Sequence, residues 1–156
     1  MSTQHIPVRR IGVRGIIINN GRLFCQQLTA NDHGEDSAFW YTPGGGLDEN
    51  ESLLDGLHRE MIEETGIAPE IGRLLFVQQF WDGEKEQLEF FFHITNTSDY
   101  AHIDLASTSH GTLEIAQCDF IDPKTERVLP AFLQTRDIDE FIASNAPVLM
   151  YTELGR

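Results

Sequence analysis

The chain has 156 residues, enough for one domain with a real core and too few for two. Its formal net charge of −14 argues against nucleic acid or an anionic membrane as a nonspecific partner, because both would be repelled. The N-terminus lacks the apolar core of a signal peptide, and no apolar run is long enough to span a membrane. We therefore expect one cytoplasmic domain over residues 1–156.

The first part of the chain carries hairpin signals. Residues 11–19 are rich in β-branched side chains and are predicted to form a strand, followed by Asn20-Gly21 and a second strand over residues 22–28. Residues 29–37 are predicted to form a polar surface loop. Residues 39–42 are expected to form a short strand, whose aromatic side chains either stack on a nucleobase or belong to the core.

Residues 43–67, here called the motif segment, pass from three glycines through an acidic turn into a predicted helix. Asn50 suits the N-cap, Gly66 suits the C′ position, and Pro69 prevents continuation. The apolar spacing predicts that one stripe of this helix is buried. That stripe consists of Leu53, Leu54, Leu57 and Met61.

Three carboxylates of the motif segment share one face of the predicted helix. Glu60, Glu63 and Glu64 stand at positions i, i+3 and i+4, and Arg59 lies one step round, so we expect no base on that face to offset them. Uncompensated carboxylates provide the oxygen ligands that Mg²⁺ prefers. A solvated acidic face is the usual explanation for this spacing when it occurs alone.

The second half alternates strands with polar connections. Strands are predicted over residues 73–81 and 86–96, joined by Asp82-Gly83, and again over residues 112–121. The continuous apolar run FFFHI indicates a strand covered on both faces. Two further segments are predicted at the end, a helix over residues 130–144 with a possible break near Asp137 and a short strand or ordered tail over residues 147–151. Together these elements predict an α+β fold.

The motif segment resembles the signature of the Nudix hydrolases, G-x5-E-x7-R-E-U-x-E-E-x-G-U, where U is a bulky aliphatic residue. Every fixed position matches. The matching residues are Gly45, Glu51, Arg59, Glu60, Met61, Glu63, Glu64, Gly66 and Ile67. The resemblance implies an α/β/α sandwich with a mixed β-sheet between helices. It also implies Mg²⁺-dependent hydrolysis of a nucleoside diphosphate linked to another moiety, X, with Mn²⁺ able to substitute.

The resemblance further implies roles for single residues. Metal ligands would be Glu60, Glu63, Glu64 and the carbonyl of Gly44, with Glu60 acting as ligand or base and Arg59 orienting the cluster. The general base is open among acids outside the motif segment, and Glu114 is our candidate because it begins a strand after a long loop, although an exposed strand-edge residue is an equal explanation. Other acids of suitable type are Glu86, Glu89, Asp99 and Asp104.

Substrate contacts are predicted from chemistry. Glycine permits close approach of a ligand to the backbone at Gly45 and Gly46. Arg14 is a candidate phosphate contact among several N-terminal arginines, and Trp40 is a candidate base contact. X remains open between a nucleoside triphosphate and a nucleotide sugar.

Two other functions fit the same motif. One is a nucleotide-binding sensor without turnover, which the intact acids disfavour. The other is an enzyme similar to isoprenoid diphosphate isomerase, whose chemistry needs a cysteine near the reacting carbons. Cys25 and Cys118 both lie in apolar, strand-like runs and are predicted to be buried free thiols, so we rank that function below hydrolysis. A homodimer is common among relatives.

Overall fold

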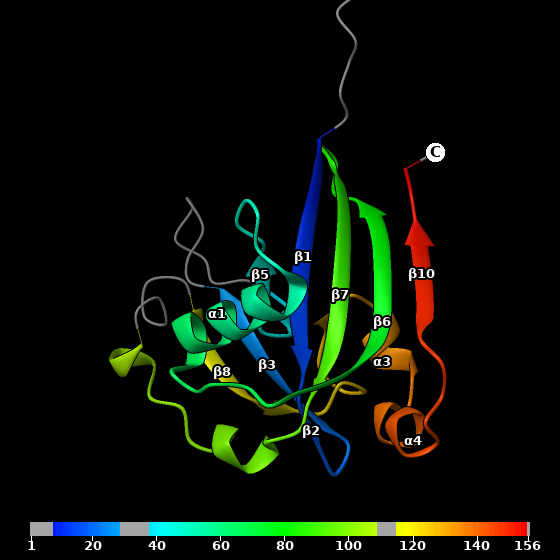
Figure 1. Ribbon diagram of the computed structural model, residues 1–156. Coiled ribbons are helices and arrows are strands. Elements are labelled where there is room, and N and C mark those ends of the chain that lie inside the picture. Colours follow the sequence, from blue (N-terminus) through cyan, green and yellow to red (C-terminus); the bar gives the residue numbers. More distant parts are fainter. Residues whose placement is uncertain (1–7, 29–37, 109–114, 156) are drawn as a thin grey trace, which may run out of the picture.

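The computed structural model describes residues 8–28, 38–108 and 115–155 and has two mixed β-sheets at its centre (Figure 1). The first sheet has the strand order β10-β6-β7-β1-β5, and the second has the order β2-β3-β4-β9 with β8 paired to β3. The strands of the first sheet are β1 (Arg9–Ile16), β5 (Gly44–Gly46), β6 (Ile71–Trp81), β7 (Glu86–Ile94) and β10 (Leu149–Glu153). Those of the second are β2 (Ile18–Asn19), β3 (Arg22–Leu28), β4 (Trp40–Tyr41), β8 (Ile115–Ile121) and β9 (Val128–Leu129).

Helices lie on both sides of the first sheet. The helix α1 (Leu53–Thr65) packs on β1 and β5, while α3 (Phe132–Thr135) and α4 (Ile138–Ala143) lie on the other side near β10 (Figure 1). Pairing within the sheet is mixed, because β1 runs parallel to β7 and antiparallel to β5. The predicted α+β sandwich, with a mixed sheet between helices, is therefore confirmed.

Two hydrophobic clusters fill the spaces on either side of this sheet. Phe91 packs with Phe76 and Leu133 in the cluster under α3 and α4. The next residue of β7, Phe92, belongs to the cluster under α1 together with Met61. Neighbouring side chains in a strand point to opposite faces, so the run FFFHI is covered on both sides, as its composition predicted.

The predicted first hairpin is present between β2 and β3. Asn20 and Gly21 both have positive φ angles, 51° and 78°, as a two-residue hairpin turn requires. The predicted strand over residues 11–19 is divided into β1 and β2, which pair in different sheets. The loop predicted over residues 29–37 lies outside the described residues.

The ends of α1 differ in one respect from the prediction. Ser52 is the N-cap, because its side chain accepts a hydrogen bond from the Asp55 N–H at 3.1 Å. Asn50 instead takes a left-handed conformation with φ 60° in the preceding turn. Gly66 ends the helix as predicted, with φ 76° and its N–H bonded to the carbonyl of Ile62.

The buried stripe of α1 is narrower than the spacing suggested. Leu57 and Met61 are fully buried, but half of Leu54 is exposed to solvent. Close packing explains the glycine at position 56 within this helix, because a Cβ on Gly56 would lie 2.2 Å from the Leu47 side chain. The helix therefore sits close against the loop that precedes it.

The end of the chain confirms the predicted break in the last helix. Asp137 separates α3 from α4 and caps the second, accepting a hydrogen bond from the Glu140 N–H at 3.0 Å. The polar connection after β7 forms two 3₁₀ turns, η1 (Thr97–Tyr100) and η2 (Leu105–Ser107). β10 is an edge strand parallel to β6. Within the described ranges, no helix has both the length and the hydrophobicity to cross a bilayer.

Candidate active site

A cavity of about 920 Å³ opens beside the motif segment, within the size range of small-molecule sites in proteins. One end is formed by the strand β5 together with Glu60 and Glu64 of α1. Arg10 and Arg14 of β1 supply positive charge to its wall. Its aromatic lining residues are Phe39, Tyr41, Phe80 and Trp81. A nucleotide has the size, the negative charge and the planar base that such a cavity accommodates.

The glycines of β5 allow the acids and the backbone to lie this close. Gly44 has a φ of 142°, and a Cβ there would lie 2.0 Å from the carbonyl oxygen of Val13. A Cβ at Gly45 would lie 2.6 Å from the carboxylate of Glu60. Side chains at these positions would therefore distort the backbone at Gly44 and displace the acid at Gly45.

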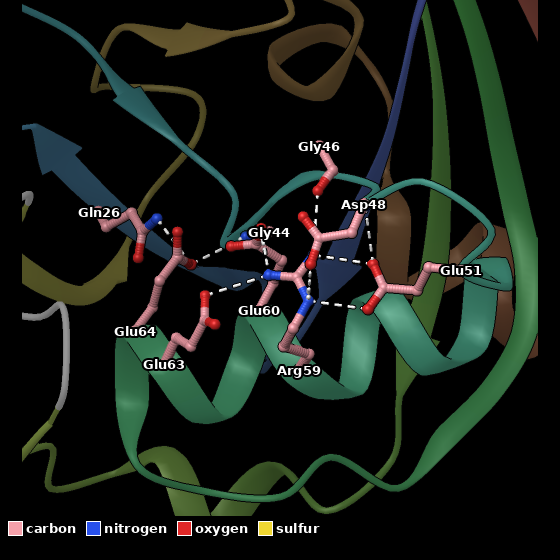
Figure 2. Close-up of polar contacts among 9 residues, drawn as sticks. All are labelled: Gln26, Gly44, Gly46, Asp48, Glu51, Arg59, Glu60, Glu63 and Glu64. Carbon is pink, nitrogen blue, oxygen red and sulfur yellow. Dashed lines mark hydrogen bonds and ion pairs between the residues drawn. The ribbon is translucent and has the colours of Figure 1, made fainter.

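Glu64 is the most buried acid of the motif segment, with 6% of its surface exposed. Its Oε2 accepts hydrogen bonds from the Gly44 N–H at 3.0 Å and from Nε2 of Gln26 at 3.1 Å (Figure 2). Burial raises the pKa of Glu64 to about 8, against the opposing effect of the Arg14 charge. The fold thus holds a carboxylate in a place where its negative charge is poorly compensated.

Gln26 is a site residue that the sequence did not single out. It comes from β3 in the second sheet and is only 1% exposed. Its amide nitrogen bonds Glu64, but within the described part of the chain its Oε1 has no hydrogen-bond partner. The sequence feature that could have identified Gln26 is its position directly after the apolar run from Leu23 to Cys25, where the strand is still buried.

Arg59 is the centre of an ion-pair network between α1 and the loop that precedes it (Figure 2). Its Nε and Nη2 each donate to Glu51 at 2.8 Å, and Nη2 also donates to the Gly46 carbonyl at 3.1 Å. Its Nη1 reaches Glu60 at 3.0 Å and Glu63 at 3.2 Å. The expectation that no base offsets these acids was therefore wrong, because the arginine side chain is long enough to reach round the helix.

The three predicted metal ligands have unequal surroundings. Glu60 lines the cavity, and burial raises its pKa despite the neighbouring Arg59 charge. Glu63 is not among the lining residues, and its carboxylate lies against Arg59. Of these three predicted ligands, Glu60 and Glu64 face the cavity and Glu63 does not.

Arg14 is held over the cavity by three contacts. Its Nη1 donates to the Thr42 carbonyl at 3.1 Å, and its Nη2 lies 3.3 Å from Oε1 of Glu89. The guanidinium carbon is 5.8 Å from the centre of the Tyr41 ring. The structure therefore brings Arg14 together with the predicted lining glycines Gly45 and Gly46.

One predicted residue is placed elsewhere, and another lies outside the described residues. Trp40 packs against the hydrophobic cluster under α3 and α4, and the geometry gives it no contact with the cavity. Its neighbours Phe39 and Tyr41 line the cavity instead, because alternate residues of a strand face opposite sides. The candidate base Glu114 lies outside the described residues.

The oxygen donors at this end of the cavity fit a hard divalent cation. Glu64 is buried and Glu60 is partly buried, and burial raises the pKa of both, so a bound positive charge would stabilise their ionised forms. A cation can also bridge carboxylates to phosphate oxygens. The arrangement can thus hold an anionic substrate despite the acids around it.

Comparison with known proteins agrees with this geometry. A family model described as NUDIX domain matches residues 8–136. This chain is 36% identical to the RNA pyrophosphohydrolase of Pasteurella multocida over 67 residues, which are 43% of its length. Over the same number of residues it is 42% identical to the RNA pyrophosphohydrolase of a Psychrobacter species. The matched segments cover 32% and 36% of those relatives, so the chain spans about a third of their length.

Solved structures show the same fold. The MutT protein from Methanosarcina mazei has a TM-score of 0.64 at 22% identity, covering 94% of this chain and 100% of that one. The E. coli ORF135 protein has a TM-score of 0.64 at 18% identity, covering 90% of this chain and 93% of that one. With the family model matching most of its length, the chain belongs to the NUDIX domain family.

Proposed function

We propose that this protein hydrolyses the diphosphate bond of a nucleoside diphosphate linked to another moiety, X, with Mg²⁺ as cofactor and Mn²⁺ as a substitute. X is a further phosphate in a nucleoside triphosphate, or a sugar in a nucleotide sugar. The observation that carries the proposal is the position of Glu60 and Glu64. Glu64 is buried and Glu60 is partly buried, both have raised pKa values, and both face a nucleotide-sized cavity that also contains Arg14.

The metal would be held by Glu60, Glu63 and Glu64, with the Gly44 carbonyl as a further ligand. When bound, it would withdraw charge from the diphosphate oxygens and lower the pKa of a bound water. The chain itself positions these ligands. Gln26 and the Gly44 N–H hold Oε2 of Glu64, which leaves its second oxygen for a metal.

Arg59 and Arg14 have separate tasks in this proposal. Arg59 orients Glu60 and Glu63 by hydrogen bonds from one nitrogen, Nη1, while Glu51 fixes its other side. Arg14 lies inside the cavity, where it would bind a phosphate oxygen and stabilise the charge that develops during cleavage. Glu114 remains our candidate for the base that accepts a proton from the attacking water.

The structure weighs against the isomerase alternative. Cys25 is fully buried in the cluster under α3 and α4, and burial raises the pKa of its thiol, which disfavours the reactive thiolate. Cys118 is half-buried, and neither cysteine lines the cavity. The chemistry that needs a cysteine beside the substrate therefore has no candidate here.

A second candidate substrate is the 5′-terminal triphosphate of RNA, because the curated relatives are named RNA pyrophosphohydrolases. The 5′ end of RNA offers the same type of phosphate anhydride as a free nucleotide. The net charge of −14 favours the small nucleotide, since an RNA body would add repulsion along its whole length. We therefore propose a small-molecule substrate, and equal efficiency on 5′-triphosphorylated RNA would overturn that choice.

The test measures phosphate products with Mg²⁺ for nucleoside triphosphates, nucleotide sugars, ADP-ribose, dinucleoside polyphosphates and 5′-triphosphorylated RNA. We expect metal-dependent turnover of a small nucleotide in the wild type, and its loss in Glu64→Gln. Glu49→Gln, at an exposed acid in the turn before α1, is the matched control. Tight nucleotide binding without turnover of any substrate would contradict hydrolysis and support the sensor function.

We also propose that residues 1–156 form a single NUDIX domain that acts in the cytoplasm as a homodimer. Nucleic acid and membranes are not expected as partners. Size-exclusion chromatography with light scattering tests the dimer, and a monomeric mass at micromolar concentration would contradict it.

A further inference from the structure

Two buried polar side chains lie next to each other on the floor of the cavity. Gln78 of β6 is directly opposite Glu89 of β7 in the antiparallel ladder, so their side chains share one face of the sheet. Gly12 of β1 is the registered neighbour of Glu89 on its other side. Both polar residues line the cavity, and they belong to no part of the motif segment.

These side chains are buried yet incompletely bonded. Glu89 is 6% exposed and Gln78 is 7% exposed. Arg14 lies 3.3 Å from Oε1 of Glu89. Among the described residues, Oε2 of Glu89 and the amide of Gln78 have no hydrogen-bond partner. Neither residue has a fully enclosed polar atom without a partner among the described residues, so these groups open into the cavity that they line, where a ligand can form hydrogen bonds with them.

The acids of the motif segment and this pair line the same cavity. A Cβ at Gly12 would lie 3.3 Å from Cγ of Glu89 and 3.5 Å from the Gly45 carbonyl oxygen, so the glycine lets Glu89 and Gly45 lie close together. Arg14 bonds Glu89 and also lowers the pKa of Glu64 by its charge. Arg14 thus lies between the acids and Glu89. A ligand with its diphosphate at the acids can therefore extend past Arg14 to the floor pair.

The surrounding surface fits a flat, partly apolar group. Phe80 follows Gln78 on the same face of β6, and Phe39, Tyr41, Leu129 and Pro130 also line the cavity. Aromatic and apolar walls with a few polar groups at the floor are typical of sites that bind a planar heterocycle.

We propose that Glu89 and Gln78 bind the hydrogen-bonding edge of the nucleobase and select an edge with two adjacent N–H donors and a carbonyl, as in guanine. A carboxylate only accepts hydrogen bonds, so it matches the N1–H and the 2-amino group. An amide can donate to the O6 carbonyl. Uracil places carbonyls on both sides of its single N–H and fits this pair poorly. This inference rests on the proposed function, because the diphosphate site is what places the base.

The test compares GMP with IMP, which lacks only the 2-amino group, by calorimetry in Mg²⁺. Neither nucleotide contains an anhydride bond, so turnover does not disturb the measurement. We expect the wild type to bind GMP about tenfold more tightly, as loss of one hydrogen bond to a buried charged group implies. In Glu89→Gln the ratio should fall to within about twofold, since the amide matches two donors poorly.

The matched control is Glu86→Gln. Glu86 is in the same strand and also pairs with an arginine, Arg9, but it lies outside the cavity lining. The control should keep the wild-type ratio. Equal binding of GMP and IMP by the wild type would overturn the inference. An equal loss of affinity for GMP and IMP in Glu89→Gln would also overturn it. That result would mean that Glu89 acts on the phosphate end of the ligand by positioning Arg14.

Failure of this inference differs from failure of the proposed function. Turnover that is lost in Glu64→Gln, without any preference for GMP over IMP, retains the hydrolase and removes the base selection. A GMP preference that depends on Glu89, in a protein without turnover of any nucleotide, retains the base selection and removes the hydrolase.

Discussion

Glu51 and Glu64 belong to the same motif segment, yet the fold shifts their pKa values in opposite directions. Two hydrogen bonds from Arg59 lower the pKa of Glu51 to about 2. Burial at the cavity raises the pKa of Glu64 to about 8. The two residues have the same chemistry, so the difference comes entirely from what the fold places beside each carboxylate.

The difference separates structural acids from acids available for function. Glu51 already has its cation, and its pair with Arg59 holds the motif loop against the helix through the Gly46 carbonyl. Glu64 has two hydrogen bonds and no ion pair among the described residues. A bound divalent cation is the compensation that Glu64 lacks and Glu51 does not need. Their variants should therefore lose different properties.

The largest expected effect is the loss of turnover in Glu64→Gln. We expect kcat to fall by about 10²–10³-fold, the range for removing one group that stabilises transition-state charge. The thermal midpoint should not fall, because the neutral amide avoids the cost of burying a charge and keeps an oxygen that accepts from the Gly44 N–H. Steady-state kinetics and thermal unfolding measure the two properties, and a rate equal to that of Glu49→Gln would refute the assignment.

A smaller effect is expected when the support of Glu64 is removed. In Gln26→Leu, the carboxylate loses the amide that fixes its Oε2. The Mg²⁺ concentration needed for half-maximal activity should rise by about tenfold, as is usual for residues that orient metal ligands. At saturating Mg²⁺, kcat should return close to the wild-type value.

The control for this variant is Gln27→Leu. Gln27 is the next residue of β3 and bonds Gln117, away from Glu64. An unchanged Mg²⁺ requirement in Gln26→Leu, or an equal rise in both variants, would show that Gln26 does not position the acid.

The smallest effect is expected in Glu51→Gln and concerns stability more than turnover. Because the folded pKa of Glu51 lies below its ordinary value of 4.5, its ionised form stabilises the fold at neutral pH. This contribution is present above about pH 4.5 and is lost as the pH falls toward 2. Wild type and variant should therefore differ by a few degrees in thermal midpoint at pH 7 and converge as the pH falls to about 2. A constant difference across that range would contradict the ion-pair explanation.

Local signals predicted much of the fold. Asn20-Gly21, Gly66 and Asp137 each gave the position of a turn or helix end that the structure confirms, because the conformation there depends on the residue itself. The N-cap was assigned to Asn50 where Ser52 serves, since both residue types suit a cap and only the structure shows which side chain reaches an N–H. Strand partners in two different sheets depend on distant residues and could not be predicted.

The candidate site was predicted only in part for the same reason. Motif spacing identified Glu60 and Glu64 at the cavity, but it did not show that Arg59 reaches round the helix to Glu63. Gln26 comes from another sheet, so no spacing within the motif segment points to it. The direction of side chains in a short strand depends on how the strand pairs, which the sequence does not show. The prediction therefore chose Trp40, whereas its neighbours Phe39 and Tyr41 line the cavity.

The most direct test of the account is a Mn²⁺ titration of the wild type, Glu64→Gln and Glu49→Gln, followed by water-proton relaxation without any nucleotide. The central claim is that the acids at the cavity, above all the buried and poorly compensated Glu64, bind the divalent cation. We predict that Glu64→Gln weakens Mn²⁺ binding by at least about tenfold while Glu49→Gln keeps the wild-type affinity. Equal affinity in all three proteins would contradict the claim.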